Sequence, residues 1–221
     1  MMNRSSILRI SGILAAAAFT LWFLVSAFNS LGGVALLNRF GLDFETIIRI
    51  NSGVHLLGSV LLAAAFGVLA MDKENLVAGL FGVVYAGIGC VLSFGVLRIH
   101  GNNVFCWSLV CIVYVALTVM LFLSVVFIKN NVPRTLRFLA IAAVAYMVVS
   151  QLIWQGVNVY CECSGVSPHE RQAIYAVVRF FTTLPGLLSG VILVVYFIGQ
   201  ACTSDRCQAS CDDGAYLPPQ Q

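Results

Sequence analysis

The sequence predicts an all-α membrane protein, built as a polytopic bundle of six transmembrane helices. Of the 221 residues, 60% are hydrophobic and only 10% are charged, whereas soluble domains carry about 25% charged residues. The apolar residues gather into six stretches, each near the roughly 20 residues that a helix needs to cross a bilayer. The alternating pattern of barrel strands is absent, and a helix satisfies its own backbone hydrogen bonds in lipid. The spans use up the length, so we expect no separate soluble domain.

The six predicted spans follow one another with short connections, and only Arg179 places a firm charge well inside any of them. The segments 72–75, 98–103 and 129–135 allow only tight turns, so successive spans should pack as antiparallel pairs. In chain order, the spans cover about residues 10–31, 53–71, 76–97, 104–128, 136–160 and 173–199.

The first span has two readings. Arg4 and Arg9 precede its apolar run, and Val25-Ser26-Ala27 resembles a signal-peptidase site. Cleavage there would leave five spans in the same orientation. The run is long for a signal peptide, which favours a retained helix.

The segment 38–52 before the second span also has two readings. Its apolar residues recur near helical spacing with Asp43, Glu45 and Arg49 between them. That pattern fits a short amphipathic helix lying at the membrane interface. The alternative is extra helical turns at the start of the second span.

Positive charges in the loops indicate the orientation, since cytosolic loops carry an excess of Lys and Arg. One side of the membrane would hold Arg4, Arg9, Lys73, Lys129, Arg134, Arg137 and Arg206. The other side would hold only Arg39, Arg49, Arg98 and Arg171. We therefore place both termini in the cytosol, in either the plasma membrane or an endomembrane.

Small residues recur at intervals of four on three of the spans. Such faces let helices approach closely in lipid. We expect them to pack the bundle internally, and self-association or contact with other membrane proteins is the alternative. The faces consist of Ala78, Gly82, Ala86 and Cys90; of Ser59, Ala63 and Gly67; and of Gly186 and Gly190.

The polar residues within the membrane concentrate in the fifth and sixth spans. Gln151, Gln155 and Asn158 are four and three residues apart, which puts them on one helix face. Arg179 should lie at a similar depth in the next span. In a structural reading, Arg179 either reaches toward the headgroups or donates to the amide oxygens of Gln155 and Asn158 and pins the two helices together. In a functional reading, the group lines a polar cavity, open to the outside, for an anionic solute. Pro185 favours the second reading slightly, because it frees a backbone carbonyl about one turn earlier.

The cysteines outside the spans suggest two modifications. Cys161 and Cys163 lie in the outer loop and Cys106 lies near it, so we hypothesise a disulfide from Cys106 to one of the other two. Past the last span, residues 200–221 should form a disordered cytosolic tail. Three cysteines there are candidates for palmitoylation, and their spacing does not fit a metal site. They are Cys202, Cys207 and Cys211.

No motif for catalysis, phosphate binding or a cofactor appears, and no basic run suggests nucleic acid. None of the nine Asp and Glu residues lies inside a span, which argues against a proton-coupled carrier or an acidic cation filter. We therefore expect a non-enzymatic protein, with the lipid bilayer as its surroundings, that organises or contacts other membrane proteins. The alternative is a small transporter or channel whose polar site lies between the fifth and sixth spans.

Overall fold

The computed structural model describes residues 2–30, 37, 39–41, 43–95 and 104–213, and these residues form helices and turns without any strand. The predicted all-α class is therefore confirmed. The helices are α1 (Arg4–Ser30), α3 (Phe44–Leu69), α4 (Leu76–Gly95), α5 (Val104–Phe127), α6 (Arg134–Cys163) and α7 (Pro168–Asp213).

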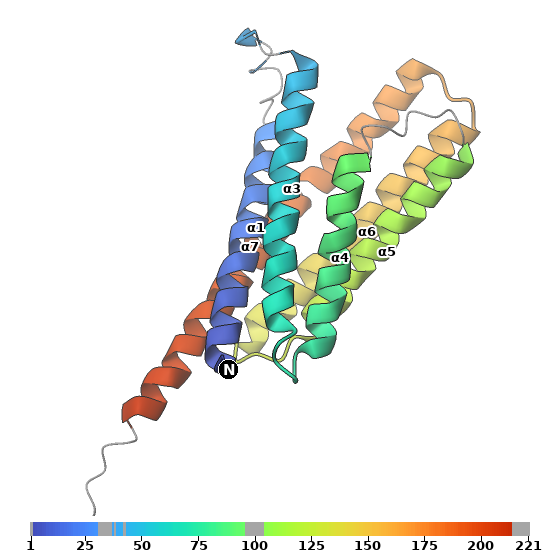
Figure 1. Ribbon diagram of the computed structural model, residues 1–221. Coiled ribbons are helices and arrows are strands. Elements are labelled where there is room, and N and C mark those ends of the chain that lie inside the picture. The colour runs from blue at the N-terminus through green and yellow to red at the C-terminus, as the bar shows by residue number, and fades with distance from the viewer. Residues whose placement is uncertain (1, 31–36, 38, 42, 96–103, 214–221) are drawn as a thin grey trace, which may run out of the picture.

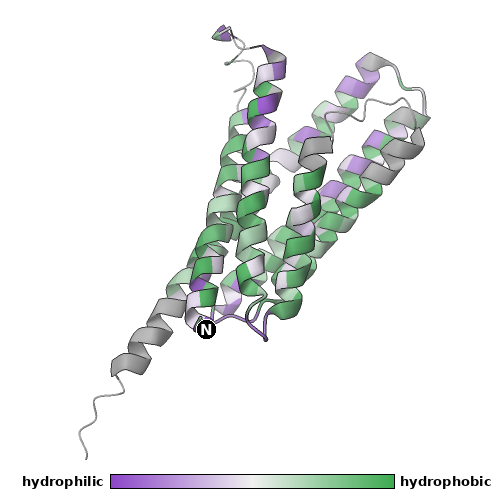
Figure 2. Ribbon diagram, in the orientation of Figure 1, coloured by the Kyte–Doolittle hydropathy of each residue, from purple (hydrophilic) through white to green (hydrophobic). Residues whose placement is uncertain are grey.

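Four of these helices are long and apolar enough to cross a membrane. The segments that meet this length and hydropathy are Arg4–Ser30, Glu45–Leu69, Arg134–Cys161 and His169–Thr203. In the other two, α4 and α5, the apolar stretches found among the described residues are shorter, Leu76–Val91 and Cys111–Phe127. Apolar residues cover the middle of the helices in Figure 2, and polar residues gather at their ends and in the turns.

The helices form a ring in chain order. Each packs on the next one along the chain, and α7 closes the ring by packing on α1; across the described ranges no other helix pair brings Cα atoms within 8 Å of each other. Figure 1 shows that the helices converge at the end where the chain begins, which we call the closed end. At the opposite end, the open end, α1 and α3 lean away from α4 to α7.

Helix α3 begins nine residues earlier than the second predicted span. The Asp43 side chain caps it by accepting a hydrogen bond from the Thr46 backbone N–H at 2.6 Å. Hydrogen bonds from Thr46 hold the pKa of the Asp43 carboxyl below its ordinary value, and Arg49 adds to the effect. Ile47, near the start of α3, is already buried. The alternative of extra helical turns on the second span is therefore the one that the structure adopts.

Helix α7 begins with a reciprocal cap and runs past the predicted end of its span. The Glu170 carboxylate accepts from the Ser167 hydroxyl at 2.7 Å, and Ser167 Oγ accepts from the Glu170 N–H at 3.3 Å. At the other end, helix continues through 200–213, where we expected the disordered tail to start. Packing accounts for the first residues of this extension, because Gln200 is buried and donates to the Leu8 carbonyl of α1 at 3.1 Å. Residues 214–221 lie outside the described part of the chain.

The core lies in the half of the ring near the closed end. Phe197 of α7 stacks on Phe19 of α1, with ring centroids 5.5 Å apart, and meets Phe66 of α3 edge-on at 6.4 Å. A Cβ at Gly12 would come within 2.8 Å of the Phe197 carbonyl. Gly12 therefore sets how closely α1 and α7 approach.

The small-residue face on α4 packs inside the bundle. Ala78 and Ala86 are buried, and a Cβ added at Gly82 would overlap the ring of Phe66 on α3. On α3, Ser59 is buried as well. These three residues of α4 and Ser59 of α3 thus serve contacts within the chain, and self-association through the remaining faces stays a prediction.

Candidate ligand-binding cavity

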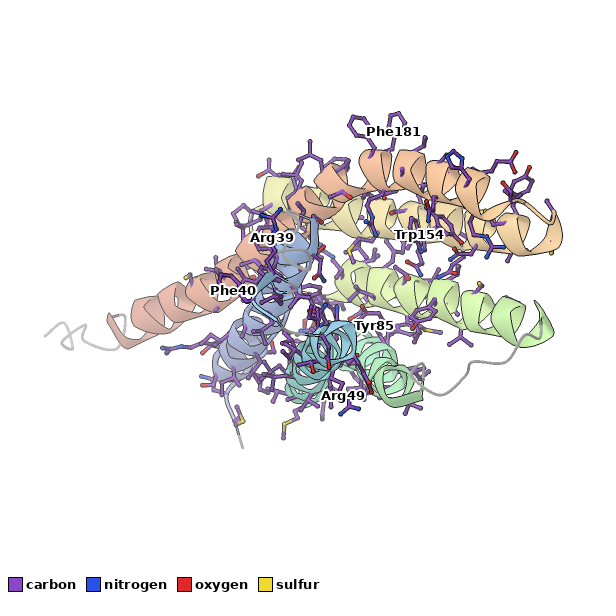
Figure 3. All side chains as sticks on the ribbon, turned by 90° about the horizontal axis from the view of Figure 1, so that it is seen from above. Arg39, Phe40, Arg49, Tyr85, Trp154 and Phe181 are labelled. Carbon is purple, nitrogen blue, oxygen red and sulfur yellow. The ribbon has the colours of Figure 1, made fainter. Side chains whose placement is uncertain are left out.

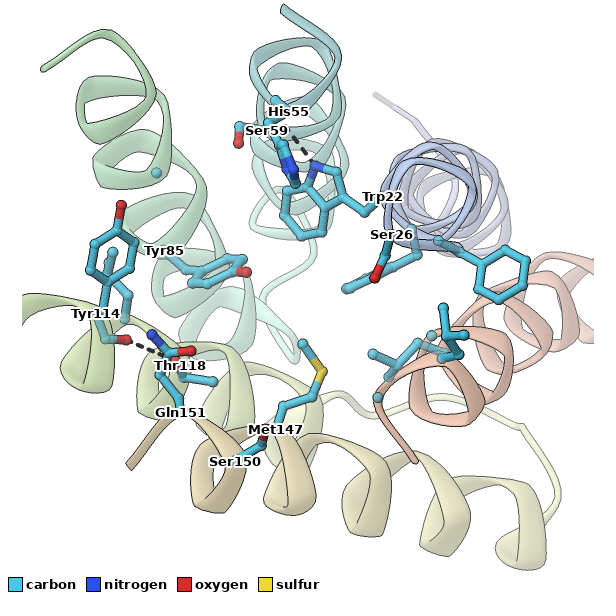
Figure 4. A pocket seen from close by; sticks show the side chains of 18 of the residues that line it. Trp22, Ser26, His55, Ser59, Tyr85, Tyr114, Thr118, Met147, Ser150 and Gln151 are labelled. Carbon is cyan, nitrogen blue, oxygen red and sulfur yellow. Dashed lines mark hydrogen bonds between the residues drawn. The ribbon is translucent and has the colours of Figure 1, made fainter. Parts of the chain in front are cut away.

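The ring of helices encloses a cavity of about 790 Å³, to which all six helices contribute side chains (Figure 4). Small-molecule sites in proteins usually measure about 300–1,000 Å³. At one end of the lining Leu193 is fully buried in the core, and at the other end Ser26 is exposed. The cavity therefore opens toward the open end and is sealed below.

One side of the cavity is aromatic and aliphatic. Trp22 of α1 meets Tyr85 of α4 edge-on with ring centroids 6.2 Å apart, and its indole N–H points to the His55 carbonyl at 3.4 Å. Phe19 and Phe23 extend this side along α1, and Leu187 and Leu193 of α7 line the same space. Seen down the ring in Figure 3, Tyr85 points inward.

The facing side, formed by α5 and α6, carries hydroxyl and amide groups. Tyr114 and Thr118 line it from α5, and Ser150 and Gln151 line it from α6, across from Trp22 in Figure 4. The Thr118 hydroxyl already donates to the Tyr114 carbonyl at 2.7 Å. No hydrogen bond joins the side chains of Ser150 or Gln151 to another described residue, so both remain available to a ligand.

No Asp, Glu, Lys or Arg stands among the described residues that line the cavity. His55 is the one lining side chain whose ordinary titration falls near neutral pH. The lining thus offers polar contacts without a fixed charge.

At the closed end, polar side chains join α1 to the α3–α4 turn and to the end of α5. The Asn75 amide donates to Asp72 Oδ2 at 2.7 Å and to the Lys129 carbonyl at 3.1 Å, and Asn75 Oδ1 accepts from the Lys129 N–H at 2.6 Å. Arg4 contacts Asp72 at 3.3 Å and Glu74 at 3.0 Å. We call Arg4, Asp72, Glu74, Asn75 and the Lys129 backbone the polar clamp.

A second polar group joins α7 to its neighbours at the same end. Asn130, in the α5–α6 loop, donates to the Tyr196 hydroxyl at 2.9 Å and to Gln200 Oε1 at 3.1 Å. Gln200 in turn donates to Ser11 Oγ of α1 at 2.9 Å. The closed end is therefore held by hydrogen bonds as well as by apolar packing.

Pro185 has a structural partner on α6. Proline lacks the N–H that would bond the carbonyl four residues earlier, here that of Phe181. The Tyr146 hydroxyl lies 3.3 Å from this carbonyl and donates to it. Tyr146 thus compensates for Pro185 and links α6 to α7 beside the cavity.

The four predicted polar residues of the fifth and sixth spans are not gathered into one site. Gln151 lines the cavity. Gln155 Oε1 accepts from Asn158 at 3.3 Å and from the Cys111 thiol at 2.9 Å, which ties α6 to α5. Arg179 is exposed and is not part of the cavity lining.

The cysteines proposed for modification are placed only in part. Cys161 is buried and Cys163 exposed, and both are free thiols. The side chain of Cys106 lies outside the described residues, so the disulfide hypothesis stays untested. Cys202 is an exposed free thiol, and Cys207 and Cys211 follow it on α7, where their side chains are not described.

Sequence reasoning missed most of the cavity. Tyr85, Tyr114, Thr118 and Ser150 come from three helices, and spacing within one helix does not show that they converge. The usable signal was the interval of four between Tyr114 and Thr118, which puts an aromatic and a hydroxyl on one face of a span.

Comparison of the chain with models of known protein families, with curated proteins and with solved structures gives no match.

Proposed function

We propose that this chain is a six-span, non-enzymatic integral membrane protein that binds a small molecule in its central cavity, as a binding protein or a small transporter. The observation that carries the proposal is the cavity itself, which every helix lines and which extends from the buried core to exposed residues toward the open end. With both termini cytosolic, as the loop charges favour, the cavity would face away from the cytosol.

Helix lengths support six spans. Helices α4 and α5 contain 20 and 24 residues, and at ~1.5 Å per residue each is at least about 30 Å long. Helix α1 supports retention of the first span, because Ala15, Ala18 and Phe19 are buried within the ring.

Thiol accessibility tests this proposal without knowledge of the ligand. In a variant without native cysteines, reconstituted in liposomes, Ser150→Cys reports on the cavity. Leu152→Cys, on the exposed side of α6, is the matched lipid-facing control. A charged, membrane-impermeant thiol reagent should modify Ser150→Cys from the open end only and leave Leu152→Cys unmodified. Equal rates at the two positions, or no reaction at Ser150→Cys, would refute an accessible cavity.

The membrane-organising role remains a second proposal, supported by the end of α7. This helix projects beyond the rest of the bundle at the closed end (Figure 1) and carries Cys202 there as an exposed thiol. Acylation of Cys202, Cys207 and Cys211 would hold the projection against the bilayer. Acyl-exchange labelling of the triple Cys→Ser variant checks this, and labelling equal to that of the original protein would contradict it.

A further inference from the structure

We infer that the cavity takes an uncharged, amphipathic molecule with a flat ring system and one hydrogen-bonding end. The inference rests on the proposed function and names the ligand class of the same site. It follows from three features of the lining. These are its aromatic side, the Ser150 and Gln151 side chains that bond no other described residue, and the absence of Asp, Glu, Lys and Arg among the described lining residues.

The aromatic side favours a flat ring. The rings of Trp22 and Tyr85 are fixed edge to face, and Phe19 supports Trp22 at a centroid separation of 5.6 Å. Aromatic pairs prefer offset or edge-to-face contacts, so a planar ligand can extend this array without displacing its members. An aliphatic chain would gain burial there but not these contacts.

The polar side favours a single hydrogen-bonding group at one end of the ligand. The Gln151 amide supplies both donors and an acceptor, and Ser150 beside it adds a hydroxyl. These groups lie on α6, across the cavity from Trp22 (Figure 4). A ligand with its ring near Trp22 and its polar end near Gln151 therefore satisfies both sides.

The absence of charge among the described lining residues favours a neutral ligand. A charged ligand leaves water on entering, and no opposite charge in this lining offsets that loss. The faces of Trp22 and Tyr85 would attract a cation, but no carboxylate in the described lining adds to that attraction. An anion would meet only neutral donors.

Ligand protection of a cavity thiol tests this inference at neutral pH. The reporter is Ser150→Cys in the background without native cysteines, and the probes are naphthalene, 2-naphthol, 2-naphthoate and 2-naphthylmethylammonium. All four carry the same flat ring system. Ser164→Cys, exposed in the α6–α7 turn, is the control for direct effects on the reagent.

We expect 2-naphthol to slow modification of Ser150→Cys at concentrations at least about tenfold lower than either charged analogue requires. No probe should affect Ser164→Cys. Adding Gln151→Leu should reduce protection by 2-naphthol to the level of naphthalene, and an unchanged rate without ligand shows that the cavity is intact. Adding Gly186→Leu should abolish protection, because a Cβ at Gly186 meets no atom within 4 Å and the side chain can fill the cavity.

The possible failures are distinct. If Ser150→Cys does not react while Ser164→Cys does, the cavity is inaccessible and the proposed function is wrong. If Ser150→Cys reacts but 2-naphthol gives no protection, or a charged analogue protects equally well, only the ligand class is wrong.

Discussion

Replacing Asn75 by alanine should weaken the packing of the helices at the closed end. Asn75 is fully buried, at 0% exposure, and makes three hydrogen bonds of 2.6, 2.7 and 3.1 Å. Interhelical bonds in membrane proteins average about 0.6 kcal/mol each, which gives roughly 2 kcal/mol. The Lys129 N–H also loses its partner in the clamp, and a stranded buried group costs about 1–3 kcal/mol. We therefore expect Asn75→Ala to lower the free energy of unfolding by about 3–5 kcal/mol.

Unfolding by sodium dodecyl sulfate in mixed micelles, followed by circular dichroism, measures this change. The control is Asn51→Ala, which removes one part-buried bond of 3.3 Å to Asn29 and should cost less than about 1 kcal/mol. If Asn75→Ala costs no more than Asn51→Ala, the polar clamp does not stabilise the closed end, and the reasoning is refuted.

Three further outcomes are expected. Gly82→Ala should lower the free energy of unfolding by about 1–3 kcal/mol through overpacking. Gly87→Ala on the same helix, with open space around its Cβ, should raise it by up to about 1 kcal/mol. Thermal unfolding in detergent compares the two variants, and equal changes in melting temperature would contradict the close contact at Gly82. Tyr146→Phe should cost about 1 kcal/mol but much less in a Pro185→Ala background, where the backbone regains its N–H, so a double-mutant cycle without coupling would exclude the compensation. The Asp43 cap should stabilise α3 fully above the unfolded pKa of Asp43, and this stabilisation should be lost as pH falls through the lowered folded pKa. Hydrogen exchange at the Thr46 amide measures the loss, with Asp43→Asn as the control. If acid does not raise the exchange rate in the original protein more than in the control, the cap does not depend on the carboxylate.

The all-α class and the order of the long apolar helices could be predicted from sequence because both depend on local composition. The turn at 72–75, for example, is too short for anything but an antiparallel pair. Helix ends were predicted less well. The Asp43 cap begins α3 early, and the contact of Gln200 with α1 extends α7. The early start of α3 was one of the two alternatives that the sequence offered. The extension of α7 could not be predicted without knowing where α1 lies.

The candidate site depends on how the ring closes, which spacing within a single helix does not encode. Gln151, Gln155 and Asn158 were placed correctly on one helix, yet Gln155 and Asn158 bond to each other while Gln151 faces the cavity. Arg179 was placed at their depth, and it was expected either to reach toward the headgroups or to contact the amides. Its rotation about the α7 axis places it on the exposed surface.

Contact between the first and last helices has a consequence for biosynthesis. Gly12 meets Phe197, so α1 cannot make this contact until the ribosome has synthesised the chain through residue 197. At about 5–20 residues per second, the delay is roughly 10–40 s. During that interval the Gly12 and Phe19 surface of α1 is covered by lipid or by insertion factors. Stop codons ahead of α7 should therefore yield fragments that membrane quality control removes.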